Sequence, residues 1–121
     1  MTMMNDFKLG DFEITVRDHG YATYICCSGA GDQPTPAITV RPFLNRIRIN
    51  FKGHHVALDF RKLTYANSAT ITEIVFLLHA AAAEAESAEV TYDPQVAFQR
   101  SVFGMLEKLQ VNANRLRFIQ E

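Results

Sequence analysis

The feature that most restricts the fold is a short apolar segment followed by a long one. The run HVALDF (residues 55–60) is bounded by polar residues and has the composition of a buried central strand. In residues 71–85, apolar side chains recur at helical spacing, which predicts a helix that packs on a sheet through Ile74, Val75 and Leu78. The glutamates of this segment fall largely off the apolar stripe. A strand and a helix of this kind bury their apolar sides against each other, so an α/β protein is predicted.

The segments before this pair also alternate between strand and helix signals. Residues 12–16 and 21–28 are rich in strand-forming residues, and the DHG sequence at residues 18–20 predicts a tight hairpin between them. Residues 29–36 are a loop by their glycine and proline content. Apolar side chains then recur at helical spacing in residues 42–53, which predicts a helix opened by a proline and ended by a glycine.

The C-terminal third continues the alternation. A short strand at residues 88–92 precedes a helix opened by the Asp-Pro pair at residues 93–94, and LRFI (residues 116–119) predicts an edge strand. The expected fold is therefore α/β, with a mixed β-sheet of four to five strands and helices packed on it. We expect a single domain over residues 1–121, with residues 1–10 as a flexible N-terminal segment.

Composition limits the classes of partner. The chain has 121 residues, of which 48% are hydrophobic, and this is enough for one compact core. A net charge of −1 gives no basic excess, so neither nucleic acid nor an anionic membrane is an expected partner. The sequence has no signal-peptide pattern and no run of the ~18 apolar residues that a spanning helix needs, which predicts a cytoplasmic protein.

The cysteines and histidines give no sign of a metal, a cofactor or a catalytic centre. Cys26 and Cys27 are adjacent on a predicted strand, so their side chains point to opposite faces and are poorly placed to bridge each other. We interpret both as buried small hydrophobic residues in a reducing compartment. His54 and His55 lack further ligands at a suitable spacing. No nucleophile and base can be paired either, so a protein without enzymatic activity is predicted.

The stretch LTYANSATITEIVFLL (residues 63–78) places small hydroxyl residues directly before the apolar helix. Two compatible interpretations follow. In the first, Asn67 or Ser68 caps the helix, and residues 70–73 form a capping box. In the second, Ser68 is a regulatory hydroxyl, because a phosphate at a helix N-terminus meets unpaired N–H groups and the positive end of the helix dipole. That phosphate would add about −1.5 to −2 charges.

The order of these motifs resembles the STAS domain of anti-sigma factor antagonists. In that family, an apolar strand ending in Asp leads to a loop with Asp-Ser-Ser-Gly or a similar sequence, then to an apolar helix, a short strand and a further helix. The segments HVALDF, LTYANSATITEIVFLLHAAA and VTYDPQVAFQRSVFGMLEKL follow this order, and CCSGAGD resembles the family's strand-Gly-x-x-Asp passage. The resemblance covers residues 12–119.

Carried over by position, the resemblance implies that Ser68 is the phosphoacceptor. The family's acid falls on Asn67, its second serine on Ala69 and its glycine on Thr70, so this loop departs from the family pattern. The same loop, together with Thr72 in the next turn, is the implied partner-binding surface. Thr72 is also an alternative acceptor for a phosphate.

The resemblance further implies partner switching. The unphosphorylated domain would bind an anti-sigma factor or a related serine kinase, and phosphorylation of Ser68 would weaken that complex, with the ATP belonging to the partner. Asp32 and Asp59 are the acidic positions expected near the loop. Two alternatives stay open: a scaffold that associates with a constant partner or with itself, for instance as a homodimer, and a domain that binds a small molecule or a lipid.

Overall fold

Six strands and three α-helices form the described part of this computed structural model, which covers residues 2–109 and 116–121, the first three by their backbone alone. The strands are β1 (Thr2–Leu9), β2 (Phe12–His19), β3 (Ala22–Gly31), β4 (His55–Ala66), β5 (Ser87–Tyr92) and β6 (Leu116–Gln120). The helices are α1 (Val40–Ile47), α2 (Ser68–Glu84) and α3 (Ala97–Leu109), with two short 3₁₀ helices, η1 (Pro36–Ile38) and η2 (Arg48–Asn50).

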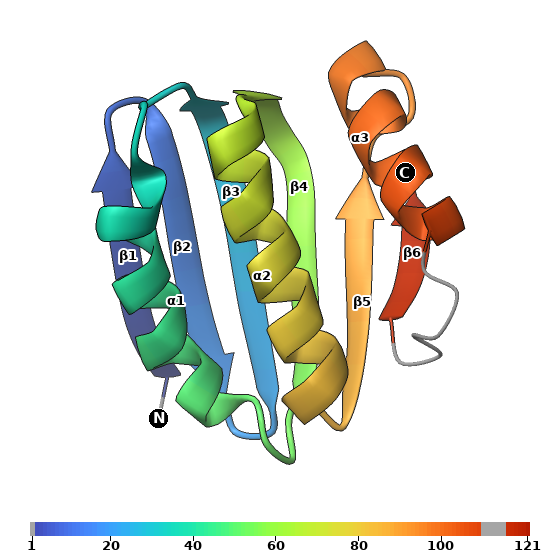
Figure 1. The fold of residues 1–121 in the computed structure, drawn as a ribbon. Coiled ribbons are helices and arrows are strands. Elements are labelled where there is room, and N and C mark those ends of the chain that lie inside the picture. Colours follow the sequence, from blue (N-terminus) through green and yellow to red (C-terminus); the bar gives the residue numbers. More distant parts are fainter. Residues whose placement is uncertain (1, 110–115) are drawn as a thin grey trace.

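The strands form one mixed sheet in chain order from β1 to β6 (Figure 1). The first three are antiparallel and joined by tight turns, in which Gly10 and Gly20 adopt the positive φ that glycine allows. From β3 onward the neighbours are parallel, because a helix connects each strand to the next. The predicted α/β class, the hairpin at residues 18–20 and the C-terminal edge strand are therefore confirmed.

All three helices lie over the same face of the sheet (Figure 1). Along β4, Val56, Leu58 and Phe60 point to this covered face and are buried, whereas Asp59 points to the other. α3 belongs to the same layer, since the ring of Phe103 stacks on Phe60 with 4.6 Å between the centroids. Among the described residues no helix covers the opposite side, here called the open face, which is formed by Glu13, Thr15, Arg17, Tyr24, Cys26, His55, Ala57, Asp59, Glu89 and Thr91.

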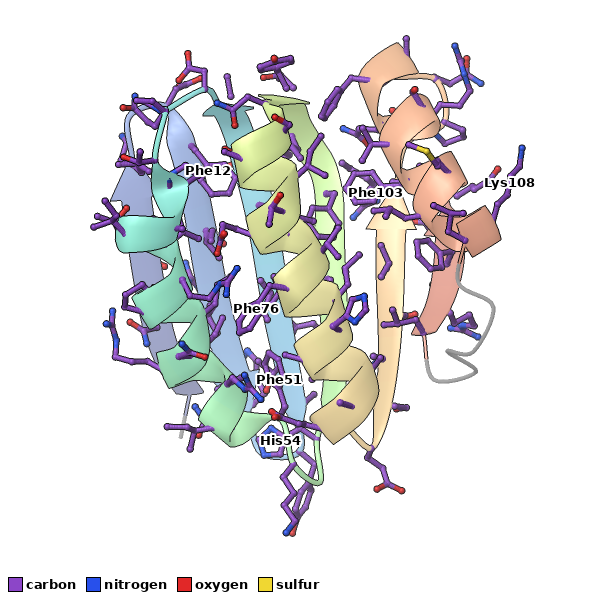
Figure 2. All side chains as sticks on the ribbon, viewed as in Figure 1. Phe12, Phe51, His54, Phe76, Phe103 and Lys108 are labelled. Carbon is purple, nitrogen blue, oxygen red and sulfur yellow. The ribbon has the colours of Figure 1, made fainter. Side chains whose placement is uncertain are left out.

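Large aromatic side chains fill the space between the helices and the covered face. Figure 2 shows Phe12 on β2, Phe51 after η2 and Phe103 on α3 in this layer, and all three are buried. Phe103 also stacks on Tyr92 of β5, with 5.7 Å between the ring centroids. Such side chains remove a large apolar area from water, so their burial in this layer is the main contribution to the stability of the fold.

The N-terminus differs from its prediction. The segment expected to be flexible forms β1, which gives the sheet six strands rather than four to five. The reason is side-chain packing as well as backbone pairing with β2: Phe7 and Leu9 lie against the core, and Phe7 stacks on Phe43 of α1 with 5.1 Å between the centroids. Met1 lies outside the described residues.

The central strand and helix are both longer than predicted. β4 continues past Phe60 to Ala66, and α2 begins at Ser68 rather than at Ile71. Only Asn67 separates the two elements. The segment predicted as a loop is therefore one capping residue and the first turn of a helix.

The packing of α2 follows the predicted stripe in part. Ile74 and Leu78 are buried as predicted, with Leu77 beside them, whereas Val75 is half-buried. Glu73 departs from the prediction, since it is buried rather than placed off the apolar side. In the described residues no helix, α2 included, is long and apolar enough to cross a bilayer.

Candidate functional site

Asn67 holds the junction between β4 and α2. Its backbone is extended, and its Oδ1 accepts a hydrogen bond from the backbone N–H of Thr70 at 2.9 Å, which makes it the N-cap of α2. Its Nδ2 donates to the carbonyl of Gln33 at 3.0 Å, and its backbone N–H donates to the carbonyl of Gly31 at 2.7 Å. The junction is thereby tied to the chain that leaves β3.

Ser68 is the first residue of α2, and its side chain is exposed. Its hydroxyl makes no hydrogen bond to any described residue, because Asn67 performs the capping. Of the two residues predicted as the cap, the structure therefore selects Asn67. The Ser68 hydroxyl is left free to react at the end of the helix where backbone N–H groups are unpaired.

The neighbours of Ser68 differ in their access to solvent. Thr72, one turn along, is exposed, but its hydroxyl donates to the carbonyl of Ser68 at 3.0 Å. Ala69 is half-buried and Thr70 is buried. Of the predicted surface, Ser68 and Thr72 are therefore exposed, Asn67 and Ala69 are partly accessible, and Thr70 is not accessible.

Thr70 fits into the junction because residue 31 is a glycine. A Cβ atom at Gly31 would lie 2.5 Å from the Cγ2 of Thr70, well inside van der Waals contact. The larger residue at the position where the resemblance implies glycine is therefore accommodated on the facing strand. The predicted capping box at residues 70–73 does not form, because Thr70 already lies in the third position of the helix and Glu73 bonds elsewhere.

Glu73 is buried and forms an ion pair with Arg41 of α1, which is half-buried. The guanidinium donates two hydrogen bonds of 2.6 and 3.0 Å to the carboxylate, and it also lies 4.0 Å from the centroid of the Phe76 ring. A buried carboxylate is tolerated only with such compensation. The pair fixes the N-terminal half of α2 against α1, and sequence reasoning missed it because nothing local links the two residues.

The two predicted acidic positions separate. Asp32 is exposed and follows Gly31, whose carbonyl binds Asn67, so it lies at the junction. Asp59 lies eight residues before Asn67 along β4, about 26 Å at 3.3 Å per residue. Its carboxylate binds Arg61 at 2.9 and 3.0 Å on the open face. Asp59 is therefore not part of the site.

Arg61 determines the ionisation of Asp59. Burial opposes its ionisation, but hydrogen bonds from the side chain and the backbone N–H of Arg61 outweigh this effect and lower the pKa of the Asp59 carboxyl. The same guanidinium reaches Glu121 at 3.0 Å. This cluster lies on the open face and does not supply a proton donor or acceptor to Ser68.

Exposed apolar side chains flank the junction, and sequence reasoning did not single them out. Tyr65 is 48% exposed and packs on Phe98 of α3, with 5.6 Å between the ring centroids. Ile38 of η1, a turn that packs against α2, is 73% exposed. An apolar side chain in solvent next to a free hydroxyl is suited to contact with a protein. A tyrosine three residues before the predicted phosphoacceptor was the available signal.

The cysteines and histidines separate as neighbours on strands do. Cys27 is buried on the covered face, but Cys26 is half-buried on the open face, so only one matches the predicted core environment. His54 contacts the Thr23 hydroxyl at 3.0 Å, and His55 contacts Ser87 and Glu89. Within residues 2–109 and 116–121 no three His, Cys, Asp or Glu side chains gather as metal ligands would.

No model of a known protein family matches this chain, and no curated protein matches it either. The fold and the junction together define a small α/β protein with an exposed serine at a strand-to-helix boundary. The likeness to STAS domains rests on the quoted sequence motifs and stays a prediction.

Proposed function

We propose that this protein is a STAS-like regulatory module, without enzymatic activity of its own, whose protein partner docks over the β4–α2 junction. Phosphorylation of Ser68 controls this docking. One observation at the junction supports the proposal: Asn67 caps α2, and the exposed hydroxyl of Ser68 makes no hydrogen bond within the part of the chain that the structure describes. The partner is an anti-sigma factor or a related serine kinase, which supplies the ATP.

The position allows a change in charge without a change in fold. A phosphate on Ser68 would meet the positive end of the α2 dipole, and it would add about −1.5 to −2 charges. Asp32 already places a negative charge at the junction. A partner surface that fits the neutral hydroxyl would therefore meet a concentrated negative charge, and the complex would weaken by repulsion and lost fit.

Asn67 supports this role despite replacing the acid that the family resemblance implies. Its side chain keeps an acceptor oxygen for the cap and adds a donor that binds Gln33. The departure therefore removes one negative charge beside Ser68 while the geometry of the junction is retained. A kinase that recognises this loop would depend on its shape and on contacts with the exposed Tyr65 and Ile38 more than on its charge.

A constant scaffold is the second candidate. The contact of Thr70 with Gly31 favours it, because the junction is filled where the family pattern places a glycine. In that case Tyr65 and Ile38 would bind a partner with no phosphorylation cycle.

The lipid-binding alternative is less well supported by the surface. A hollow of about 610 Å³ at the far end of α2 is lined by Arg48, Lys52, Glu84 and others, and these charged side chains do not suit a lipid.

The test uses substitutions at Ser68 with a matched control at Thr72. The tagged protein captures its partner from its own cell lysate, and mass spectrometry identifies the bound protein and any phosphate on residues 67–72. Affinity for the captured partner is then measured for Ser68→Ala, Ser68→Glu and Thr72→Glu.

We expect Ser68→Ala to bind as the parent does and to abolish the phosphate. Ser68→Glu should bind about tenfold more weakly, a loss of about 1.4 kcal/mol. Thr72→Glu should change the affinity less, because it lies one turn away. If Ser68→Glu binds as tightly as the parent and residues 67–72 carry no phosphate, the scaffold replaces the switch.

A further inference from the structure

The outer edge of β1 is a second surface with the features of an interface. β1 lies at the end of the sheet, and all eight of its residues pair with β2 without a register shift (Figure 1). Its sequence has no proline. Exposed edges are usually blunted by short strands, bulges or proline, since they present unpaired N–H and C=O groups to other strands. β1 uses none of these three devices, and the charged side chains that it carries, which can also discourage pairing, are one of each sign, Asp6 and Lys8.

We propose that β1 binds the β1 of a second copy of this chain, antiparallel and around a two-fold axis, so that two sheets join into one. A two-fold axis normal to the sheet keeps each side chain on its own face. Residues that meet across the axis must therefore come from the same face. This condition leaves only a few registers to compare.

Charge selects one register. Asp6 and Lys8 both lie on the open-face side, opposite Thr15 and Glu13 of β2. Centring the pair on Asp6 would oppose two aspartates, and centring it on Lys8 would oppose two lysines. Centring it on Phe7 places each Asp6 opposite Lys8 of the second copy, and such cross-strand pairs are favourable.

The contacts of these residues fit that register. Lys8 is exposed and forms no ion pair with the described residues. Asp6 binds Arg17 at 2.9 Å on one side, but its side chain remains 49% exposed. Lys8 of the second copy would approach from the other side. Phe7 is half-buried against Phe43, and its remaining surface would meet Phe7 of the second copy on the helix-covered side.

A charge-exchange experiment tests the register. Asp6→Lys opposes lysine to lysine, and Lys8→Asp opposes aspartate to aspartate. Sedimentation over a range of concentrations should show a dimer for the parent protein and at least about tenfold weaker association for each variant alone. An equimolar mixture of the two variants should recover the dimer as a heterodimer. The control is Lys52→Asp, which makes the same charge change as Lys8→Asp at an exposed site away from β1 and should keep the parent's association.

Hydrogen exchange gives a second measurement on the unmodified chain. The backbone amides of β1 should become more protected as the protein concentration rises, while those of β6 should not. Circular dichroism checks that both variants fold, as expected for exposed positions. The proposal is overturned by a parent protein that stays monomeric, by a dimer that either substitution leaves intact, or by variants that do not associate when mixed. None of these outcomes depends on Ser68.

Discussion

Cys26 and Cys27 are neighbours in β3, yet they belong to different regions of the molecule. Cys27 points to the covered face and is 1% exposed, whereas Cys26 points to the open face and is half-buried. The covered face is apolar because three helices exclude water from it. The comparison teaches that position along a strand says less about environment than the side to which the side chain points.

The open face differs from the covered face because its side chains are at least partly exposed to water. Parallel strands are usually covered on both sides, so their uncovered side chains here must tolerate water. Polar and charged groups do this in pairs, as in Asp59 with Arg61 and Glu89 with Arg117 at 3.0 Å or less. Such exposed pairs contribute little to stability. The covered face therefore holds the fold, and the open face can vary at low cost.

The largest expected difference between the regions comes from placing a charge under a helix. Leu78 is 3% exposed against the covered face, so Leu78→Asp buries an unpaired carboxylate and should cost roughly 4 kcal/mol or more, enough to unfold the domain. His79→Asp is the control, because its side chain is exposed on the same helix. Thermal melting followed by circular dichroism measures both. A folded Leu78→Asp protein with the parent's melting temperature would contradict the assigned packing.

Substitutions of the two cysteines compare the two faces of the sheet at adjacent positions. Cys27→Ala removes buried apolar volume and should cost about 1 kcal/mol, whereas Cys26→Ala should stay within about 0.5 kcal/mol. Burial raises the pKa of both thiols, so a thiol reagent should react slowly with each at neutral pH, and with Cys26 before Cys27. Denaturant melts and mass-resolved labelling check this. Equal costs, or Cys27 reacting first, would reverse the assignment of the faces.

The junction between β4 and α2 offers an effect of similar size. Asn67→Ala removes the cap of α2 and should destabilise the fold by about 1 kcal/mol. Ser68→Ala should leave stability nearly unchanged, because its hydroxyl makes no bond to the described residues. Chemical denaturation of both variants gives the two free energies of unfolding. Equal losses would mean that the serine shares the capping.

The open face should respond to acid with the smallest effect. The lowered pKa of Asp59 means that its ion pair adds stability above about pH 4 and that this contribution is lost as the pH falls through the folded pKa. Arg61→Ala should therefore be less stable than the parent at pH 7, by under about 1 kcal/mol, and the difference should shrink as the pH falls through the folded pKa of Asp59. Arg100→Ala is the control, because among the described residues its side chain donates to the carbonyl of Pro94 and forms no ion pair. A difference that persists in acid would assign the loss to packing.

Long periodic segments were predictable because their signal is local. The central strand at residues 55–60, the helix through Ile74 and Leu78 and the hairpin at residues 18–20 follow from side-chain spacing and turn residues. Ser68 could also be found in this way, since a small hydroxyl residue before an apolar helix marks a helix start. Nothing local distinguished it from Asn67 as the cap, and the backbone geometry made that choice.

Contacts between distant segments were not predictable. β1 mixes polar and apolar residues, and it forms a strand because Phe7 packs on Phe43 and its backbone pairs with β2. Glu73 reads as a surface residue, and it is buried only because Arg41 lies against it. In both cases the local pattern lacks the partner that offsets the loss of hydration or of chain entropy.

The sequence by itself determined the order of strands and helices from β2 onward, the single core and the serine at the start of the central helix, because periodicity and turn chemistry act over a few residues. Only the tertiary structure decided that the helices of the described residues cover one side of a mixed sheet, that Asp59 lies far from the serine it was expected to flank, and that Thr70 fits over Gly31. These outcomes depend on which elements meet in space. The free energy of such contacts is set by shape and charge across long separations in the chain, which no local pattern encodes.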